Sequence, residues 1–161
     1  MQLAREPHML IHKTIKVTNQ HAQLLLLADP SQTAIDRYLS RSILFDYRNN
    51  ACLLGVMALL PTRPQTIEII NLAVAEHAQR QGIGEKLVRF ALQYAKENNY
   101  TIVEVGTGTT SFGPLSLYQK CGFRIIAIES DYFLTHYTEP IIENGLVLKD
   151  LLRLRQTFLQ A

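Results

Sequence analysis

The chain has 161 residues, which fits one domain, and 47% of them are apolar, enough for one sizeable hydrophobic core. Its 16 Lys and Arg against 14 Asp and Glu leave a net charge of +2, which gives no electrostatic footprint for nucleic acid or an anionic membrane. Two cysteines, Cys52 and Cys121, make no disulfide framework, and neither they nor the five histidines have metal-ligand spacing, so we expect no metal site.

The N-terminal stretch "MQLAREPHMLIHK" lacks the long apolar run of a signal peptide. The longest apolar runs, 24–28 and 51–61, are too short to cross a bilayer. We therefore expect a cytoplasmic protein with no membrane partner.

The first half of the chain predicts a strand, two helices, a hairpin and a buried strand. Asp29-Pro30 separates the two helices, and Ser31 is the expected N-cap of the second. The turn signal "RNN" separates the two strands of the hairpin. In chain order these elements are residues 12–17, 20–28, 31–40, 42–47 with 51–60, and 66–74.

The second half alternates helices and strands. Apolar residues recur every three to four positions from Ile83 to Tyr94, and Asn98-Asn99 ends that helix. The expected elements are a helix at 83–97, a strand at 101–107, a short helix at 111–122 with Ser111 as its cap, and strands at 123–130 and 145–155. Together these patterns predict an α/β (α+β) fold, a mixed central sheet flanked by helices, in a single domain of residues 1–161.

Two glycines, Gly82 and Gly84, stand where the strand 66–74 gives way to the helix 83–97. Glycines at a helix N-terminus let a phosphate approach the unpaired amides, and Arg80 adds a positive charge beside them. The stretch is not a P-loop, since Glu85 follows Gly84, nor a dinucleotide fingerprint, since Leu87 stands where the third glycine belongs. A tight turn without a ligand is the other interpretation of these residues alone.

The stretch Gln79-Arg80-Gln81-Gly82-Ile83-Gly84 matches the Q/R-x-x-G-x-G/A signature of the GNAT N-acetyltransferase superfamily. The preceding "INLAV" resembles the bulged strand of that family, and "LYQKCGF" (117–123) resembles its "LYxKxGF" block. The chain is identified as a member on these motifs, which span about residues 42–130.

The resemblance implies that acetyl-CoA is the co-substrate. Backbone amides of residues 80–85 would bind its pyrophosphate, and the backbone of the bulged strand would pair with the pantetheine arm. The thioester would lie where this strand parts from strand 101–107. Many members have Asn at the start of the second helix, where this chain has Ser111, so that contact stays open. The implied cofactor-binding residues are Leu72, Ala73, Val74, Gln79, Arg80, Gln81, Gly82, Ile83, Gly84, Glu85, Ser111 and Tyr118.

Two residues are candidates for the chemistry. Tyr118 matches the family tyrosine that faces the cofactor sulfur and would protonate the thiolate, although a core tyrosine is the alternative. Glu68 is the candidate base that deprotonates the amine, with a structural Glu68, Glu104 or a water chain as alternatives. Cys121 as a nucleophile is less favoured than a packed cysteine.

The expected activity is direct transfer of acetyl to a primary amine of a small molecule or peptide. A non-catalytic acyl-CoA-binding module and a protein or peptide N-acetyltransferase are the alternatives. The connector 129–145 has acidic residues that would attract a cationic amine, or else it is a solvated loop. The oligomeric state stays open, with a homodimer as one candidate.

Overall fold

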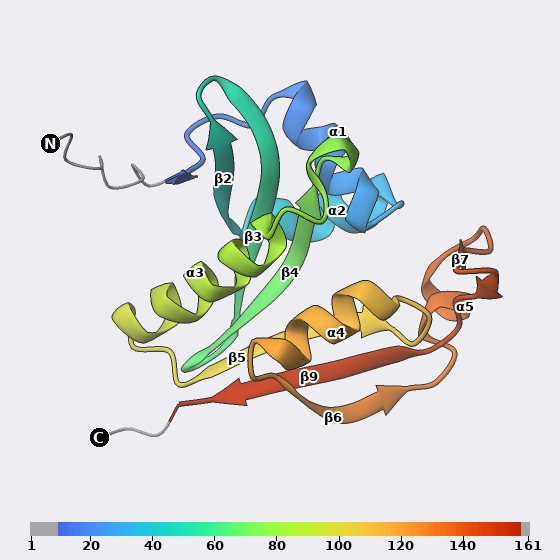
Figure 1. The fold of residues 1–161 in the computed structure, drawn as a ribbon. Helices are drawn as coiled ribbons and strands as arrows, with labels where there is room; N and C mark the ends of the chain where they lie inside the picture. The colour runs from blue at the N-terminus through green and yellow to red at the C-terminus, as the bar shows by residue number, and fades with distance from the viewer. Residues whose placement is uncertain (1–9, 159–161) are drawn as a thin grey trace, which may run out of the picture. The chain divides into compact units, whose positions relative to one another are not determined.

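The computed structural model describes residues 10–158, drawn as a ribbon in Figure 1. Its elements in chain order are β1 (Ile11–Lys13), α1 (Asn19–Ala28), α2 (Gln32–Leu39), β2 (Ile43–Asn49), β3 (Cys52–Arg63), β4 (Thr66–Val74), the 3-10 turn η1 (Glu76–Ala78), α3 (Ile83–Glu97), β5 (Ile102–Gly108), α4 (Phe112–Lys120), β6 (Arg124–Glu129), α5 (Tyr132–His136), β7 (Ile142–Glu143), β8 (Leu146–Val147) and β9 (Leu151–Thr157).

The described residues fall into two compact units, 10–58 with 71–87 and 59–70 with 88–158. The strands β3 and β4 and the helix α3 each contribute residues to both units. The seven-stranded sheet has the order β1-β2-β3-β4-β5-β9-β6, and β7 and β8 form a separate hairpin. Parallel pairing of β4 with β5 beside antiparallel pairs makes the sheet mixed, as the sequence predicts.

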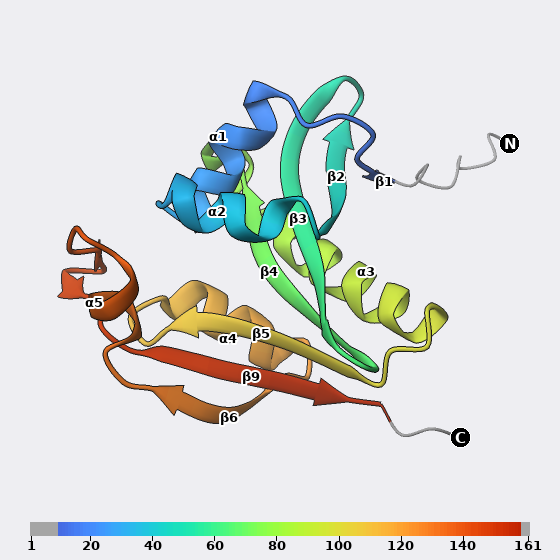
Figure 2. The same ribbon diagram turned by 180° about the vertical axis from the view of Figure 1, so that it is seen from behind.

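In the first unit, α1 and α2 lie side by side in both views (Figures 1 and 2). A buried histidine fixes α1 to β2. The Nδ1 of His21 accepts from the Thr18 amide at 3.0 Å, so its Nε2 carries the proton that Asp46 accepts at 2.9 Å. Asp46 also accepts from Thr14 and Arg48, which satisfies its buried carboxylate.

In the second unit, β9 lies between β5 and β6 and is antiparallel to both. The helix α4 lies on one face of these strands, in front of β5 in Figure 1 and behind it in Figure 2. Val105, Leu152 and Leu154 are buried, whereas alternate positions on β9 carry Arg153 and Arg155. The parallel ladder of β4 and β5 runs from Thr66 and Ile102 to Ile69 and Val105, and both strands continue beyond its last pair.

Most predicted elements are confirmed, and those with the strongest patterns have the predicted boundaries. β4 and α3 begin and end where the sequence predicts, and Asn99 has the left-handed backbone expected after α3 (φ +63°). The first strand is wrong beyond Lys13, since the chain leaves β1 there and turns toward α1. The last strand begins at Leu151, not at residue 145, because residues 146–147 form β8.

No helix among residues 10–158 is long and apolar enough to cross a membrane. The same residues contain no cluster of His, Cys, Asp and Glu that could hold a metal ion.

Candidate active site

The loop between β4 and α3 contains two residues in the left-handed region. Gly82 has φ +82° and Arg80 has φ +62°, and a Cβ built on Gly82 would meet nothing within 4 Å. The Gln79 side chain donates to the Val74 carbonyl at 3.0 Å and so fastens the loop to the end of β4. The glycine at position 82 is therefore required by the backbone conformation, and the space beside it is open.

The first turn of α3 directs backbone donors outward. Its first helical hydrogen bond runs from the Lys86 amide to the Gly82 carbonyl at 3.1 Å, so the amides of residues 83–85 precede the ladder of the helix. These amides, the partial positive charge of the helix end and the exposed Arg80 together suit a diphosphate. The Lys86 side chain is directed to β2, where its Nζ donates to the Tyr47 hydroxyl at 3.4 Å.

Strand β4 leads into this loop. Burial alternates along it from Ile67 to Val74, so that Asn71 and Ala73 are buried while Leu72 and Val74 are half-buried. The Val74 carbonyl, one of the groups expected to pair with a pantetheine arm, already accepts from Gln79. A carbonyl oxygen has a second lone pair for another donor.

Asn71 is a buried polar residue that the sequence interpretation missed. Its Nδ2 donates to the Leu25 carbonyl at 3.0 Å and to the Tyr38 hydroxyl at 2.9 Å, which joins β4 to both α1 and α2. Burial raises the pKa of Tyr38 to about 12, so its hydroxyl stays protonated at neutral pH. An asparagine in the middle of the apolar run "TIEIINLAV" is the signal that could have revealed it, because a buried amide requires partners.

Tyr118 lies in the second unit, in the last turns of α4. It is buried, and its ring packs edge-to-face on Phe123 with the centroids 5.9 Å apart. Burial, with a smaller contribution from Cys121, raises the pKa of the phenol above its ordinary value. The hydroxyl is thus a proton donor across the neutral range, and Cys121 is itself buried, as the packed interpretation predicts.

Ser111 is the N-cap residue of α4, as the sequence predicts, but its side chain makes no cap hydrogen bond. Its hydroxyl donates instead to Glu143 of β7. The next residue of that hairpin, Asn144, donates to the Thr110 carbonyl at 2.8 Å. The hairpin of β7 and β8 therefore uses the Ser111 hydroxyl, and Glu143 of the connector 129–145 is already engaged.

Glu68 belongs to a charged cluster on the second unit's sheet. Glu68 and Glu104 are direct partners on β4 and β5. Glu104 is buried and accepts from Arg63 and from Arg155, the latter at 3.1 Å. Glu68 has a weaker partner, since Arg153 Nη1 lies 3.5 Å from its Oε1 while the same guanidinium bonds Glu129.

The environment of Glu68 disfavours its charged form. Burial is the main cause that raises the pKa of the Glu68 carboxyl, and the charge of Glu104 acts in the same direction. Arg153 and, less strongly, Arg63 oppose this and do not cancel it. A half-buried carboxylate with a raised pKa and one long ion pair is a suitable proton acceptor.

Replacing Glu68 and Glu104 with neutral glutamine should change the stability of the protein in opposite directions. Because the folded pKa of Glu68 is raised, its stabilising contribution is complete below its ordinary pKa and is lost as pH rises through the folded value. Glu68→Gln should therefore gain stability relative to wild type as pH rises above the ordinary glutamate pKa, about 4. Glu104→Gln should lose about 2 kcal/mol or more at pH 7, because Arg63 and Arg155 lose their shared partner.

Urea unfolding of both variants at several pH values measures this difference. A Glu68→Gln variant that loses as much stability at neutral pH as Glu104→Gln would show that Glu68 is a structural ion-pair residue.

A model of one known protein family matches a segment of the chain that includes both motifs. The model of the family described as "Acetyltransferase (GNAT) family" matches residues 13–123. The chain belongs to the GNAT acetyltransferase family. The predicted resemblance is confirmed, and so is the fold class, a mixed sheet flanked by helices.

Curated and solved relatives agree with this membership. An N-acetyltransferase of Bacillus subtilis named YvbK, itself described as uncharacterized, is 51% identical over 131 residues, which are 81% of this chain and 84% of the relative. A Bacillus subtilis acetyltransferase solved in complex with CoA is 46% identical, with a TM-score of 0.89, 92% of this chain covered and 98% of that one.

A GNAT family acetyltransferase from Elizabethkingia anophelis, solved with acetyl-CoA bound, is 42% identical with a TM-score of 0.88, covering 92% of this chain and 97% of that one. Two relatives of this GNAT protein are thus solved with the co-substrate, or its thiol form, that the resemblance implies. This chain is accordingly an acetyltransferase.

Proposed function

We propose that this GNAT protein transfers acetyl from acetyl-CoA directly to the primary amine of a small molecule, and that residues 1–161 act as one acetyltransferase domain. The observation that carries the proposal is the Gln79–Gly84 loop, with its left-handed Gly82 and its position directly before the first helical hydrogen bond of α3. The relatives solved with CoA and acetyl-CoA support the choice of co-substrate.

The loop residues Gln79 to Glu85 would hold the pyrophosphate through backbone amides, with Arg80 as a further positive charge. Leu72, Ala73 and Val74 would offer backbone groups to the pantetheine amides, as an added strand does at a sheet edge. Ser111 would contact the co-substrate only if its hydroxyl served a second partner besides Glu143.

Two side chains of the second unit would move the protons. Glu68 takes a proton from the ammonium of the acceptor, directly or through water, and the neutral nitrogen attacks the thioester carbon. The C–N bond forms, the C–S bond breaks, and Tyr118 gives its phenol proton to the departing thiolate. The amide nitrogen releases its remaining extra proton, which returns through water to the Tyr118 phenolate. The raised pKa of Tyr118 supports this role because the donor is fully protonated before transfer and strongly basic after it, ready to be reprotonated.

Gly82 offers a test of the loop with a matched control. Gly145 also has a positive φ, +75° against +82°, and a Cβ on either meets nothing within 4 Å. Valine at either position should strain the backbone by about 1–3 kcal/mol. Only Gly82→Val should also obstruct the pyrophosphate, so we expect its CoA affinity to fall by about 10-fold or more, a loss of about 1.4 kcal/mol.

Titration calorimetry with CoA compares Gly82→Val, Gly145→Val and wild type. Equal affinities in the two variants would mean that the loop does not hold the pyrophosphate.

The acceptor is best found by a screen of primary amines with acetyl-CoA, monitored by thiol release. We expect turnover with a small amine or amino-acid-like metabolite. Turnover only with peptide N-termini or lysines would replace the small-molecule acceptor with a protein or peptide. Tight acetyl-CoA binding without turnover on any acceptor would favour the non-catalytic module.

A further inference from the structure

The strand β6 ends the sheet order and is exposed along almost its whole length. On one side it pairs with β9, and its other edge has no partner strand among residues 10–158. It carries three exposed isoleucines, Ile125 and Ile126 at 46% and Ile128 at 63%. Proteins normally protect such an edge with lysine, proline or a covering segment, because it can pair with another chain.

The register with β9 divides the β6 side chains between two faces. Ile125 and Ile128 lie opposite the buried Leu154 and Leu152, on the face that α4 covers further in. In a regular strand, residues three positions apart lie on opposite faces. Ile125 and Ile128 share a face because the register shifts between Ile125 and Ala127, where Ile126 is the additional residue of a β-bulge. Arg124 and Glu129 lie opposite Arg155 and Leu151, on the other face.

We infer that β6 pairs antiparallel with β6 of a second copy of this chain, about a two-fold axis between Ile126 and Ala127. Such an isologous contact requires a strand that complements itself. In this register Ile125 faces the partner's Ile128 on one side of the sheet. On the other side Arg124 faces the partner's Glu129, and each contact occurs twice.

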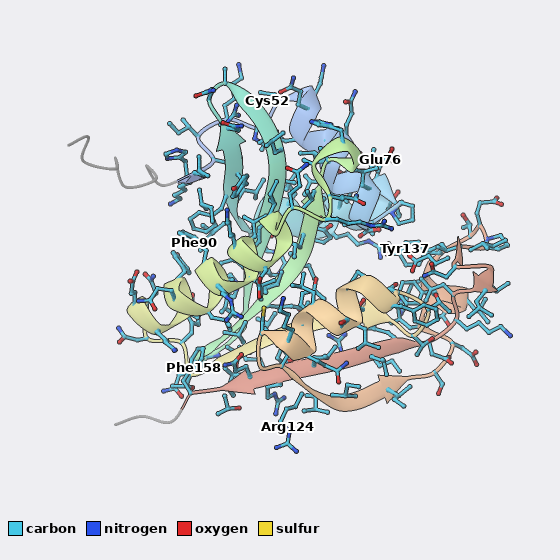
Figure 3. The ribbon with its side chains drawn as sticks, viewed as in Figure 1. Cys52, Glu76, Phe90, Arg124, Tyr137 and Phe158 are labelled. Atoms are coloured by element: carbon cyan, nitrogen blue, oxygen red, sulfur yellow. The ribbon has the colours of Figure 1, made fainter. Side chains whose placement is uncertain are left out.

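The charges support this register. Arg124 lies opposite Arg155 within its own chain, a like-charged pair, and it extends outward from the sheet in Figure 3. An anionic partner across the free edge would offset that repulsion. Glu129 accepts from Arg153 through Oε1, and its side chain is 40% exposed, so the carboxylate can accept a further donor. A shift of the register by one residue would place Arg124 opposite Ile128 or Ser130 of the partner, neither of which is charged.

The test compares oligomeric state across matched lysine variants of the full chain. Ile128 and Ile142 are similarly exposed, at 63% and 67%, but Ile142 lies on β7. By sedimentation velocity we expect a dimer for wild type and Ile142→Lys, and a monomer for Ile128→Lys at the same concentration. Because β6 is exposed, Ile128→Lys should fold and bind CoA like wild type, which serves as the folding control.

A second variant examines the register. Arg124→Glu places a like charge opposite the partner's Glu129 twice. The dissociation constant of its dimer should therefore be at least about 10-fold higher than that of wild type, and the difference should shrink at high salt. Hydrogen exchange of the β6 amides should be slow in wild type and fast in Ile128→Lys. A monomeric wild type at about 100 µM, a dimer that survives in Ile128→Lys, or a dimer that Ile142→Lys also abolishes would each overturn the inference.

Discussion

Replacing Tyr118 with phenylalanine is expected to lower kcat by about 100-fold or more while CoA affinity stays close to that of wild type. The variant removes only the hydroxyl that would protonate the thiolate. The ring that packs on Phe123 stays in place, and the loop amides that would bind the pyrophosphate lie elsewhere in the chain. Steady-state kinetics on one amine acceptor, with CoA calorimetry in parallel, measures both quantities.

Phe123 provides the control for Tyr118. Phe123→Leu removes the ring that packs edge-to-face on Tyr118 but keeps the hydroxyl, so it should lower stability and have a much smaller effect on kcat. If Tyr118→Phe instead keeps wild-type turnover, the residue is a core tyrosine and another group protonates the thiolate.

Glu68→Gln should give the second large effect, a loss of about 100-fold in rate near neutral pH with unchanged CoA affinity. Glutamine keeps the shape and the hydrogen bonds of glutamate but has no basic oxygen. An amine acceptor is mostly protonated at pH 7, so the deficit should shrink at high pH, where the neutral amine is already abundant. The measurement is the pH–rate profile of wild type, Glu68→Gln and Glu104→Gln on one acceptor.

The profile distinguishes the three candidates for the base. A deficit confined to Glu68→Gln supports Glu68, and a deficit confined to Glu104→Gln moves the role to Glu104. If Glu68→Gln follows wild type across the whole range, Glu68 has no part in proton transfer.

Variants of the two arginines of β9 test whether the acid limb of the pH–rate profile belongs to Glu68. Arg153 is the charge that most strongly lowers the pKa of Glu68, against the larger effect of burial. Arg153→Gln should therefore raise that pKa and move the acid limb of kcat/KM to higher pH. Arg155→Gln is the matched control, because Arg155 lies two residues along the same strand and bonds Glu104 instead.

The sequence predicted best those elements whose signals are local. β4 and α3 have continuous patterns and clear ends, and both have the predicted boundaries. The last strand is wrong at its start because the leucines of the hairpin at 146–148 continue the period-2 pattern of β9. A period of two identifies extended chain, and it does not reveal where one strand ends and another begins.

The contacts that define the candidate site could not be predicted, because their partners lie far apart in the chain. The Ser111 hydroxyl bonds Glu143, 32 residues away, so a rule for local caps could not anticipate it. Arg153 reaches Glu68 across β5 and β9 pairings that only the sheet order reveals. Leucine and arginine alternate in "LLRLRQT", but nothing in the sequence names the carboxylates that the arginines meet.

The central claim is that the Gln79–Gly84 loop makes this chain an acetyl-CoA enzyme, and co-substrate binding tests it most directly. Titration of the full wild-type chain with CoA or acetyl-CoA should show one site per chain with a Kd of about 1 µM or tighter, near −8 kcal/mol. No binding at millimolar CoA, from a chain that is folded by circular dichroism, would contradict the claim together with the chemistry assigned to Tyr118 and Glu68.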